Sequence, residues 1–207
     1  MNHSARITLL ALLVFILSMP MMAQQLRLGG GYSGSNVVEA GDEQWVGRAG
    51  YLLGADMAFG STWFLRPGIF LNVRNLNYSI AGLDPNGDPT GTDVEFQYTS
   101  RSLRVPLHVG RRLFDPADDT ALNIYLFAGP TALLNLNADL DNDALNVSTS
   151  PAQWYLGGGA GLEVAFLFVE AGYDVAMTNV FEGQTFRTNP KVNNAYALAG
   201  LRFNLAQ

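Results

Sequence analysis

From Gln24 onward the chain alternates between apolar and polar positions with a period of two residues. In the first such segment, Leu26, Leu28 and Tyr32 alternate with Arg27 and Gly29. Seven further segments show the same alternation, at residues 48–59, 63–74, 103–112, 122–131, 153–164, 169–177 and 195–205. This period is typical of strands with one apolar face, and a helical period is almost absent. The pattern therefore predicts an all-β domain of eight antiparallel strands.

The connections between the predicted strands alternate in length. Four are long and polar, at residues 35–44, 79–93, 137–151 and 179–193. Between them lie two short turns, at Gly60-Ser61 and Leu167, and one medium link at residues 115–120. An even number of strands with long and short connections is typical of single-chain transmembrane barrels. We therefore predict an eight-stranded up-and-down transmembrane β-barrel, with the short turns and both termini on the periplasmic side.

The first 23 residues predict a cleaved secretory signal peptide. Arg6 supplies a positive charge, residues 7–17 form an uncharged apolar core, and Pro20 precedes a cleavage site expected after Ala23. The alternative is a short membrane anchor, but 11 apolar residues are fewer than the roughly 20 that a spanning helix needs. We therefore assign residues 1–23 to the signal peptide and residues 24–207 to a single barrel domain.

Alternation alone does not decide which face of the barrel meets lipid, because a soluble lipocalin-like barrel would bury its apolar face. Three features favour a membrane. The polar face is rich in glycine, which leaves room for long side chains in a narrow interior. The apolar face carries no ionisable side chain except Arg111. Aromatic residues gather near strand ends, as membrane interfaces favour: Phe59, Trp63, Phe114, Phe166, Phe168 and Phe203 by the short turns, and Tyr32, Trp45, Tyr78, Tyr98 and Trp154 toward the long loops.

Composition narrows the possible classes of protein. Only 14% of the residues are charged, against roughly 25% in ordinary soluble domains. Hydrophobic residues make up 48% of the chain, but no apolar run is long enough for a spanning helix. The chain has no cysteine, which excludes a disulfide scaffold, and its net charge of −6 argues against nucleic-acid binding. The expected location is the outer membrane of a Gram-negative bacterium, in contact with its lipid and lipopolysaccharide.

The end of the chain carries a pattern that resembles the signal read by the outer-membrane insertion machinery. Gly200, Phe203 and Leu205 match Gly-x-x-apolar-x-apolar. Leu198 stands where a polar residue is usual, and two residues follow Leu205. We expect the insertion machinery to be a partner during assembly.

Several strand motifs resemble the PorT-like outer-membrane β-barrel family of Gram-negative Bacteroidota. The stretch 103–107, Leu-Arg-Val-Pro-Leu, resembles that family's apolar-x-apolar-Pro-apolar strand. Residues 128–130, 157–161 and 169–173 resemble its following strands, although that family often has Arg where this chain has Gly172. The resemblance covers essentially the whole mature chain and implies an outer-membrane barrel. Some members are linked to protein secretion, and no catalytic residue is carried over.

The predicted register turns a set of charged residues into the lumen. They are Arg27, Arg48, Arg66, Arg74, Arg104, Arg112 and Arg202, with Asp56, Glu163, Glu170, Asp174 and the single mature histidine, His108. Unpaired buried charges are costly, so we expect a salt-bridge network that plugs the lumen and has a structural role. Because arginines outnumber acids, the alternative is a narrow anion-favouring pore.

Catalysis and metal binding have weaker support. A lipid-modifying outer-membrane enzyme would pair a histidine with a serine and an acid, but His108 falls toward the periplasmic end, away from the outer leaflet. We therefore expect no enzymatic activity and no cofactor. Two acidic loop segments have spacings that approach a calcium loop, Asp84, Asn86, Asp88 and Glu95 in one and Asp139, Asp141 and Asp143 in the other. Pro89 and Ala144 replace the required glycine, so solvated loops that contact a protein partner are the simpler interpretation.

Overall fold

The computed structural model describes residues 24–38, 44–83, 89–114, 122–140, 150–180 and 191–205. The predicted signal peptide, residues 1–23, lies outside these ranges. All the regular secondary structure of the described residues is β-strand. These residues include no helix with the length and apolar character needed to cross a membrane.

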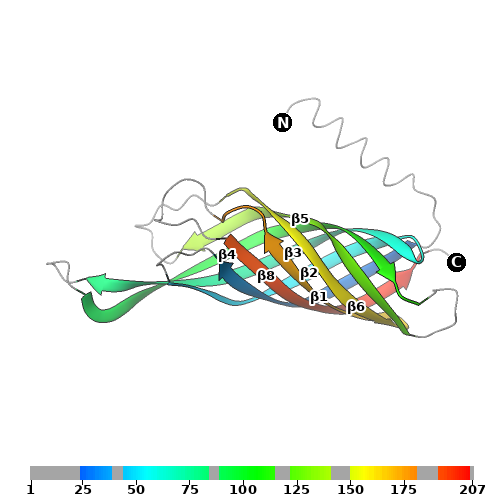
Figure 1. Ribbon diagram of the computed structural model, residues 1–207, viewed down its shortest axis with the longest axis horizontal. Helices are drawn as coiled ribbons and strands as arrows, with labels where there is room; N and C mark the ends of the chain where they lie inside the picture. The colour runs from blue at the N-terminus through cyan, green and yellow to red at the C-terminus, as the bar shows by residue number, and fades with distance from the viewer. Residues whose placement is uncertain are drawn as a thin grey trace, which may run out of the picture.

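Eight antiparallel strands form a closed barrel, in which each strand pairs with its neighbours in sequence and β1 pairs with β8 (Figure 1). Closure leaves no free sheet edge around the wall. The predicted fold class is confirmed. The strands are β1 Gln24–Val38, β2 Gln44–Phe59, β3 Trp63–Leu83, β4 Pro89–Arg112, β5 Leu122–Leu140, β6 Ala152–Val164, β7 Leu167–Ala176 and β8 Lys191–Asn204.

The short connections and the two ends of the barrel sequence lie at the same end of the molecule. The start of β1 pairs with both the end of β2 and the end of β8, and the β2–β3 and β6–β7 turns lie at this end (Figure 1). The β2–β3 turn contains Gly60 with φ of 111°, a left-handed conformation that favours glycine. We call this end the periplasmic end, following the usual arrangement of short turns in outer-membrane barrels.

Strands β3 and β4 extend well beyond the rest of the wall at the opposite end (Figure 1). The prediction of a loop at residues 79–93 is therefore wrong for much of this range, because β3 continues to Leu83 and β4 begins at Pro89. The predicted loops at 35–44, 137–151 and 179–193 are likewise shortened at the strand ends. The physical reason is that cross-strand pairing satisfies backbone groups in water as well as in lipid, so polar side chains do not end a strand.

The two faces of the wall have opposite character, as the alternation predicts. Leu53, Leu156 and Val169 point outward and are 62%, 56% and 55% exposed. Arg27 and Arg66 point inward and are 1% and 2% exposed. An apolar exterior around a charged interior suits a hydrocarbon surrounding and is the reverse of a soluble barrel.

Arg48 is an exception to the predicted register. Its side chain is exposed, and its backbone pairs with that of Asn75 on the outward face. The register between β2 and β3 shifts between Arg48 and Tyr51, which marks a β-bulge. A bulge adds one residue to one strand, so the inward and outward positions exchange beyond it. The prediction of a lumenal Arg48 is therefore wrong.

Two aromatic residues assigned to the interfaces point into the barrel instead. Phe168 and Tyr98 are 2% and 1% exposed. Both are inward by the parity of their strands, because their neighbours Val169 and Thr99 lie on the outer face. Tyr32 and Trp154 are 61% and 52% exposed, as the interface assignment requires. The side chains of Trp45 and Tyr78 are not among those that the structure describes.

Candidate functional site in the barrel lumen

The lumen is crossed by successive layers of polar side chains, contributed by all eight strands. From the periplasmic end upward, the layers contain Arg112 with Glu163, then Glu170 with two arginines, then Arg104 with Asp174, and finally Arg74 with neutral partners. We call these the first to fourth layers. Within the described residues the lumen holds six arginines and four acids.

The first layer closes the periplasmic end. Glu163 Oε2 lies 3.3 Å from Arg112 Nε and 2.8 Å from Arg202 Nη1. Arg112 Nη2 donates to Gln25 Oε1 at 2.6 Å, and Arg112 Nη1 donates to the carbonyl oxygens of Gly60 and Ser61. Arg112 and Glu163 are buried, whereas the Arg202 side chain keeps 18% exposure. Glu163 thus joins β6 to β4 and β8, and Arg112 ties this cluster to the β2–β3 turn.

Glu170 is the centre of the second layer. Its Oε2 accepts hydrogen bonds from Arg66 Nη1 at 2.6 Å, Arg27 Nη2 at 2.9 Å and the Tyr125 hydroxyl at 2.9 Å. Asp56 approaches the same two arginines at 3.4 and 3.9 Å. Two guanidinium groups and two carboxylates are therefore balanced in one compact, buried cluster that links β1, β2, β3, β5 and β7.

Aromatic rings surround the arginines of the first two layers. The Arg27 guanidinium lies 3.9 Å from the centroid of the Phe168 ring, and that of Arg66 lies 4.4 Å from Phe127. The Arg112 guanidinium lies 4.8 Å from the Phe64 ring. These distances are within the range of cation–π attraction, which is stronger when the groups are desolvated. Phe64 and Phe127 lie on the inward face of their strands, but period-two alternation gives no reason to expect them to stack on particular arginines.

The third layer is a single bidentate ion pair. Arg104 Nε and Nη2 donate to Asp174 Oδ2 at 3.1 and 2.8 Å, and both residues are buried. The Tyr196 ring lies 4.6 Å from the Arg104 guanidinium. The pair joins β4 to β7 across the lumen, so it ties strands that are not neighbours in the wall.

The fourth layer differs from the others because its cation has neutral partners. Arg74 Nη1 donates to the Tyr155 hydroxyl at 3.1 Å, and Arg74 Nη2 donates to Gln153 Oε1 at 3.3 Å. The Tyr155 hydroxyl donates to the same Gln153 oxygen at 2.8 Å. Within the described ranges Arg74 has no carboxylate partner. Among the described residues the lumen therefore keeps a positive excess, to which Arg74 contributes together with the two arginines that share Glu163.

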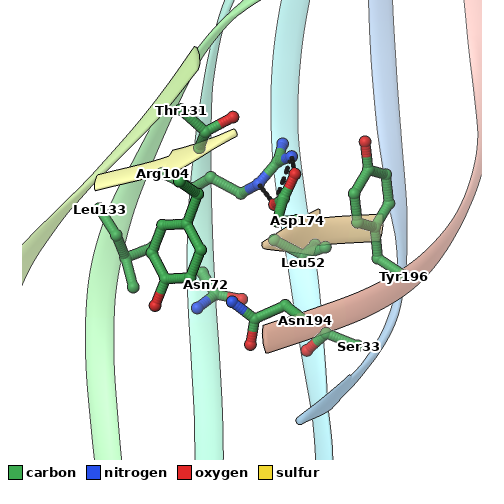
Figure 2. A pocket seen from close by; sticks show the side chains of 10 residues that line it. Ser33, Leu52, Asn72, Arg104, Thr131, Leu133, Asp174, Asn194 and Tyr196 are labelled. Carbon is green, nitrogen blue, oxygen red and sulfur yellow. Dashed lines mark hydrogen bonds and ion pairs between the residues drawn. The ribbon is translucent and has the colours of Figure 1, made fainter. Parts of the chain in front are cut away.

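A small cavity separates the third and fourth layers (Figure 2). Its volume is about 10 Å³, roughly the space that one water molecule requires. Its lining includes Arg104, Asp174, Thr131 and Tyr196 (Figure 2). Tyr155 of the fourth layer also lines it. The layered side chains thus fill the lumen at this level almost completely.

The glycines of the inner face make room chiefly for aromatic rings. A Cβ on Gly161 would overlap the tip of the Tyr125 ring, and one on Gly172 would overlap that of Tyr196. The sequence led us to expect that glycine makes room for arginine. In the structure the glycines leave space for aromatic rings, and these rings in turn contact the guanidinium groups of the arginines.

His108 lies inside the barrel beside the second layer. Its Nδ1 is 3.3 Å from Arg66 Nη2, its ring centroid is 4.9 Å from that of Phe127, and the residue is 1% exposed. No serine shares a hydrogen bond with His108 among the contacts of the described residues. The arrangement is that of a packed core histidine rather than of a nucleophile and its base.

The remaining candidates lie elsewhere. Asp84, Asn86, Asp88, Asp141 and Asp143 fall outside the described residues, and only the backbones of Glu95 and Asp139 are described. In the described part of the chain no three His, Asp or Glu side chains are grouped as a metal site would require. Gly200 pairs with Gly29 in the wall, and Phe203 and Leu205 are 44% and 47% exposed at the periplasmic end.

Comparison with protein families matches residues 8–203 to one described as "Outer membrane protein beta-barrel domain". No curated protein matches the chain significantly.

Solved structures with the same architecture are outer membrane proteins. OprG from Pseudomonas aeruginosa is 14% identical, with a TM-score of 0.56 over 88% of this chain and 96% of that one. Ail of Yersinia pestis, in complex with the heparin analogue sucrose octasulfate, is 17% identical, with a TM-score of 0.48 over 88% of this chain and all of that one. Neisserial surface protein A is 16% identical, with a TM-score of 0.43 over 87% of this chain and 97% of that one. At such identities the likeness to OprG supports the barrel fold and nothing further.

Proposed function

Because the chain belongs to the family of outer membrane protein β-barrel domains and resides in the outer membrane of a Gram-negative bacterium, we propose that it is a sealed, non-enzymatic anchor. In this proposal the barrel fixes the protein in the membrane, and the extracellular part carries its role as a structural or interaction protein. The resemblance of its strands to PorT-like barrels supports a link to secretion or to envelope integrity.

The layered lumen is the observation that carries this proposal. Buried ion pairs cross the barrel at three levels, and the cavity above them has room for about one water molecule. Ions would have to displace several charge-assisted hydrogen bonds at each level, and such bonds are stronger than neutral ones. A pathway of this kind is expected to be closed to steady conduction.

The extension of β3 and β4 supports an interaction role for the outer end. The β2 pairing to β3 ends at Ser79, whereas β3 and β4 stay paired with each other as far as Leu83 and Pro89. This two-stranded projection presents backbone beyond the wall, where a partner is able to reach it (Figure 1).

A small anion-favouring pore is the second candidate, and one observation favours it. Within the described residues six inward arginines face four inward acids, and Arg74 has only neutral partners near the extracellular end. An excess of buried positive charge attracts anions.

Recordings in planar lipid bilayers distinguish the two candidates. We expect the refolded full-length protein to give no steady current in these bilayers, while a protease-protection assay on lipid vesicles that contain the same preparation reports that the protein is inserted. A steady current that prefers anions over cations would reject the sealed anchor and support the pore. An enzymatic role is tested separately, because His108→Ala is expected to leave the lipid profile of the envelope unchanged.

A further inference from the structure

The outward face of β4 is bounded by an arginine at each end of its apolar stretch. Arg111 is exposed at the periplasmic end, and Arg101 is exposed toward the opposite end. The outward residues between them are all apolar: Val109, Leu107, Val105 and Leu103.

The spacing of these two arginines fits the thickness of the membrane. They are ten residues apart, which at about 3.3 Å per residue corresponds to about 33 Å along the strand. A strand tilt of roughly 40° reduces this to a height of about 25 Å, which is the height of the apolar band of an outer-membrane barrel. Arg111 therefore lies at the periplasmic interface and Arg101 at the extracellular interface.

A second exposed arginine joins Arg101 at the extracellular interface. The bulge on β2 turns Arg48 outward, where it pairs with Asn75 of β3, and Asn75 pairs in turn with Thr99 of β4. Thr99 and Arg101 occupy the same face of β4, two residues apart. The two arginines are thus separated by about 10 Å across the sheet and about 7 Å along the strands, so both guanidinium groups are able to reach one anionic group between them.

The surface between the two arginines is polar and held in place. Asn75 Nδ2 donates to the Ala49 carbonyl at 2.8 Å, and Thr99 Oγ1 donates to Asn75 Oδ1 at 3.0 Å. These neutral bonds occupy Asn75 and supply no counter-charge to either arginine. We call Arg48, Asn75, Thr99 and Arg101 the arginine patch.

The arginine at the opposite interface has a different environment. The Arg111 guanidinium lies 5.6 Å from the centroid of the Trp63 ring, a cation–π distance. Across the ranges that the structure describes, neither Arg48 nor Arg101 has an ion pair or a ring partner. Among the described residues, the guanidinium groups of Arg48 and Arg101 at the extracellular interface are therefore free, whereas that of Arg111 at the periplasmic interface is already engaged.

We propose that the arginine patch binds a phosphate group of lipopolysaccharide in the outer leaflet. A guanidinium presents a planar fork of donors that matches phosphate oxygens, and paired arginines suit a multiply charged group. The patch lies at the level of lipid headgroups rather than in the lumen. The proposal rests on the membrane location of the barrel and is independent of whether the lumen conducts.

Binding of purified lipopolysaccharide to the full-length protein in nanodiscs tests the proposal. We expect Arg48→Gln with Arg101→Gln to weaken binding at least tenfold, and Arg111→Gln, as the matched control, to change it less than twofold. Dephosphorylated lipopolysaccharide is expected to bind the unmodified protein weakly. Its affinity should equal that of intact lipopolysaccharide for the double variant. Arg48→Lys with Arg101→Lys keeps both charges but lacks the planar pair of donors of a guanidinium. This variant should bind with an affinity between those of the unmodified protein and the double glutamine variant.

Three results would overturn the proposal. The first is that the double variant binds lipopolysaccharide with the affinity of the unmodified protein. The second is that Arg111→Gln weakens binding as much as the double substitution does. The third is that phosphatidylglycerol vesicles compete for the protein as strongly as lipopolysaccharide does. The last result would assign the patch to phospholipid phosphate instead. The variants are compared only after each shows the heat-dependent shift in gel mobility of a folded barrel, and both changed side chains are exposed, so folding is expected to be retained.

Discussion

The barrel carrying Glu170→Gln is expected to unfold at a clearly lower urea concentration than the unmodified protein. Glu170 Oε2 accepts hydrogen bonds from Arg27, Arg66 and Tyr125, and all four residues are buried. Removing one partner of a buried ion pair leaves uncompensated charge and typically costs about 3–5 kcal/mol. Fluorescence of the three tryptophans during urea unfolding in lipid vesicles measures this loss.

A companion variant separates the loss of charge balance from a change of shape. Adding Arg27→Met, Arg66→Met and Asp56→Leu to Glu170→Gln removes all four charges of the second layer, so that no ion of the cluster is left unpaired. Because replacement of a complete buried ion cluster by uncharged side chains is often neutral, this quadruple variant is expected to regain most of the lost stability. If Glu170→Gln unfolds at the same urea concentration as the unmodified protein, the second layer does not stabilise the barrel as described.

Gly161→Ala is expected to destabilise the barrel although it adds a single methyl group. The new Cβ would overlap the end of the Tyr125 ring, whose hydroxyl donates to Glu170 at 2.9 Å. Overpacking costs about 1–3 kcal/mol, and displacing a hydrogen bond to a charged group costs about 1.5–3 kcal/mol. The same unfolding assay measures the effect.

Gly34→Ala is the matched control for this substitution. A Cβ at Gly34 has no neighbouring atom within 4 Å, so the change is expected to be neutral or slightly stabilising. Equal effects of the two substitutions would mean that the loss arises from glycine conformation in strands rather than from the Tyr125 ring.

The faces of most strands could be predicted from the chain, and those of a few residues could not. Arg27, Asp56 and Arg66 point inward, as period-two alternation indicates. Arg48 does not, because one extra residue at a bulge reverses the faces, and nothing in the local pattern marks where that residue is inserted. Phe168 was assigned to the interface from its position near a turn, whereas the parity of its strand turns it inward.

The pattern of the lumen shows the same division. Its charges were visible in the sequence, but their pairing was not. Glu170 of β7 meets Arg66 of β3, 104 residues away and across the barrel. Which side chains meet depends on the stagger of the closed sheet, a property of all eight registers together. The stacking of aromatic rings on particular arginines follows from the same stagger.

The sequence by itself determined the strand number, the closure and the orientation of the two faces. The hydrocarbon of a membrane accepts only apolar side chains on the protein surface that faces it, and it requires every backbone group to be hydrogen-bonded. A strictly alternating sequence meets both requirements as a closed barrel with its apolar face outward. Tertiary structure decided the layers of the lumen, the room that glycine leaves for aromatic rings and the outward turn of Arg48. These depend on distances between strands far apart in the chain, which local periodicity does not encode.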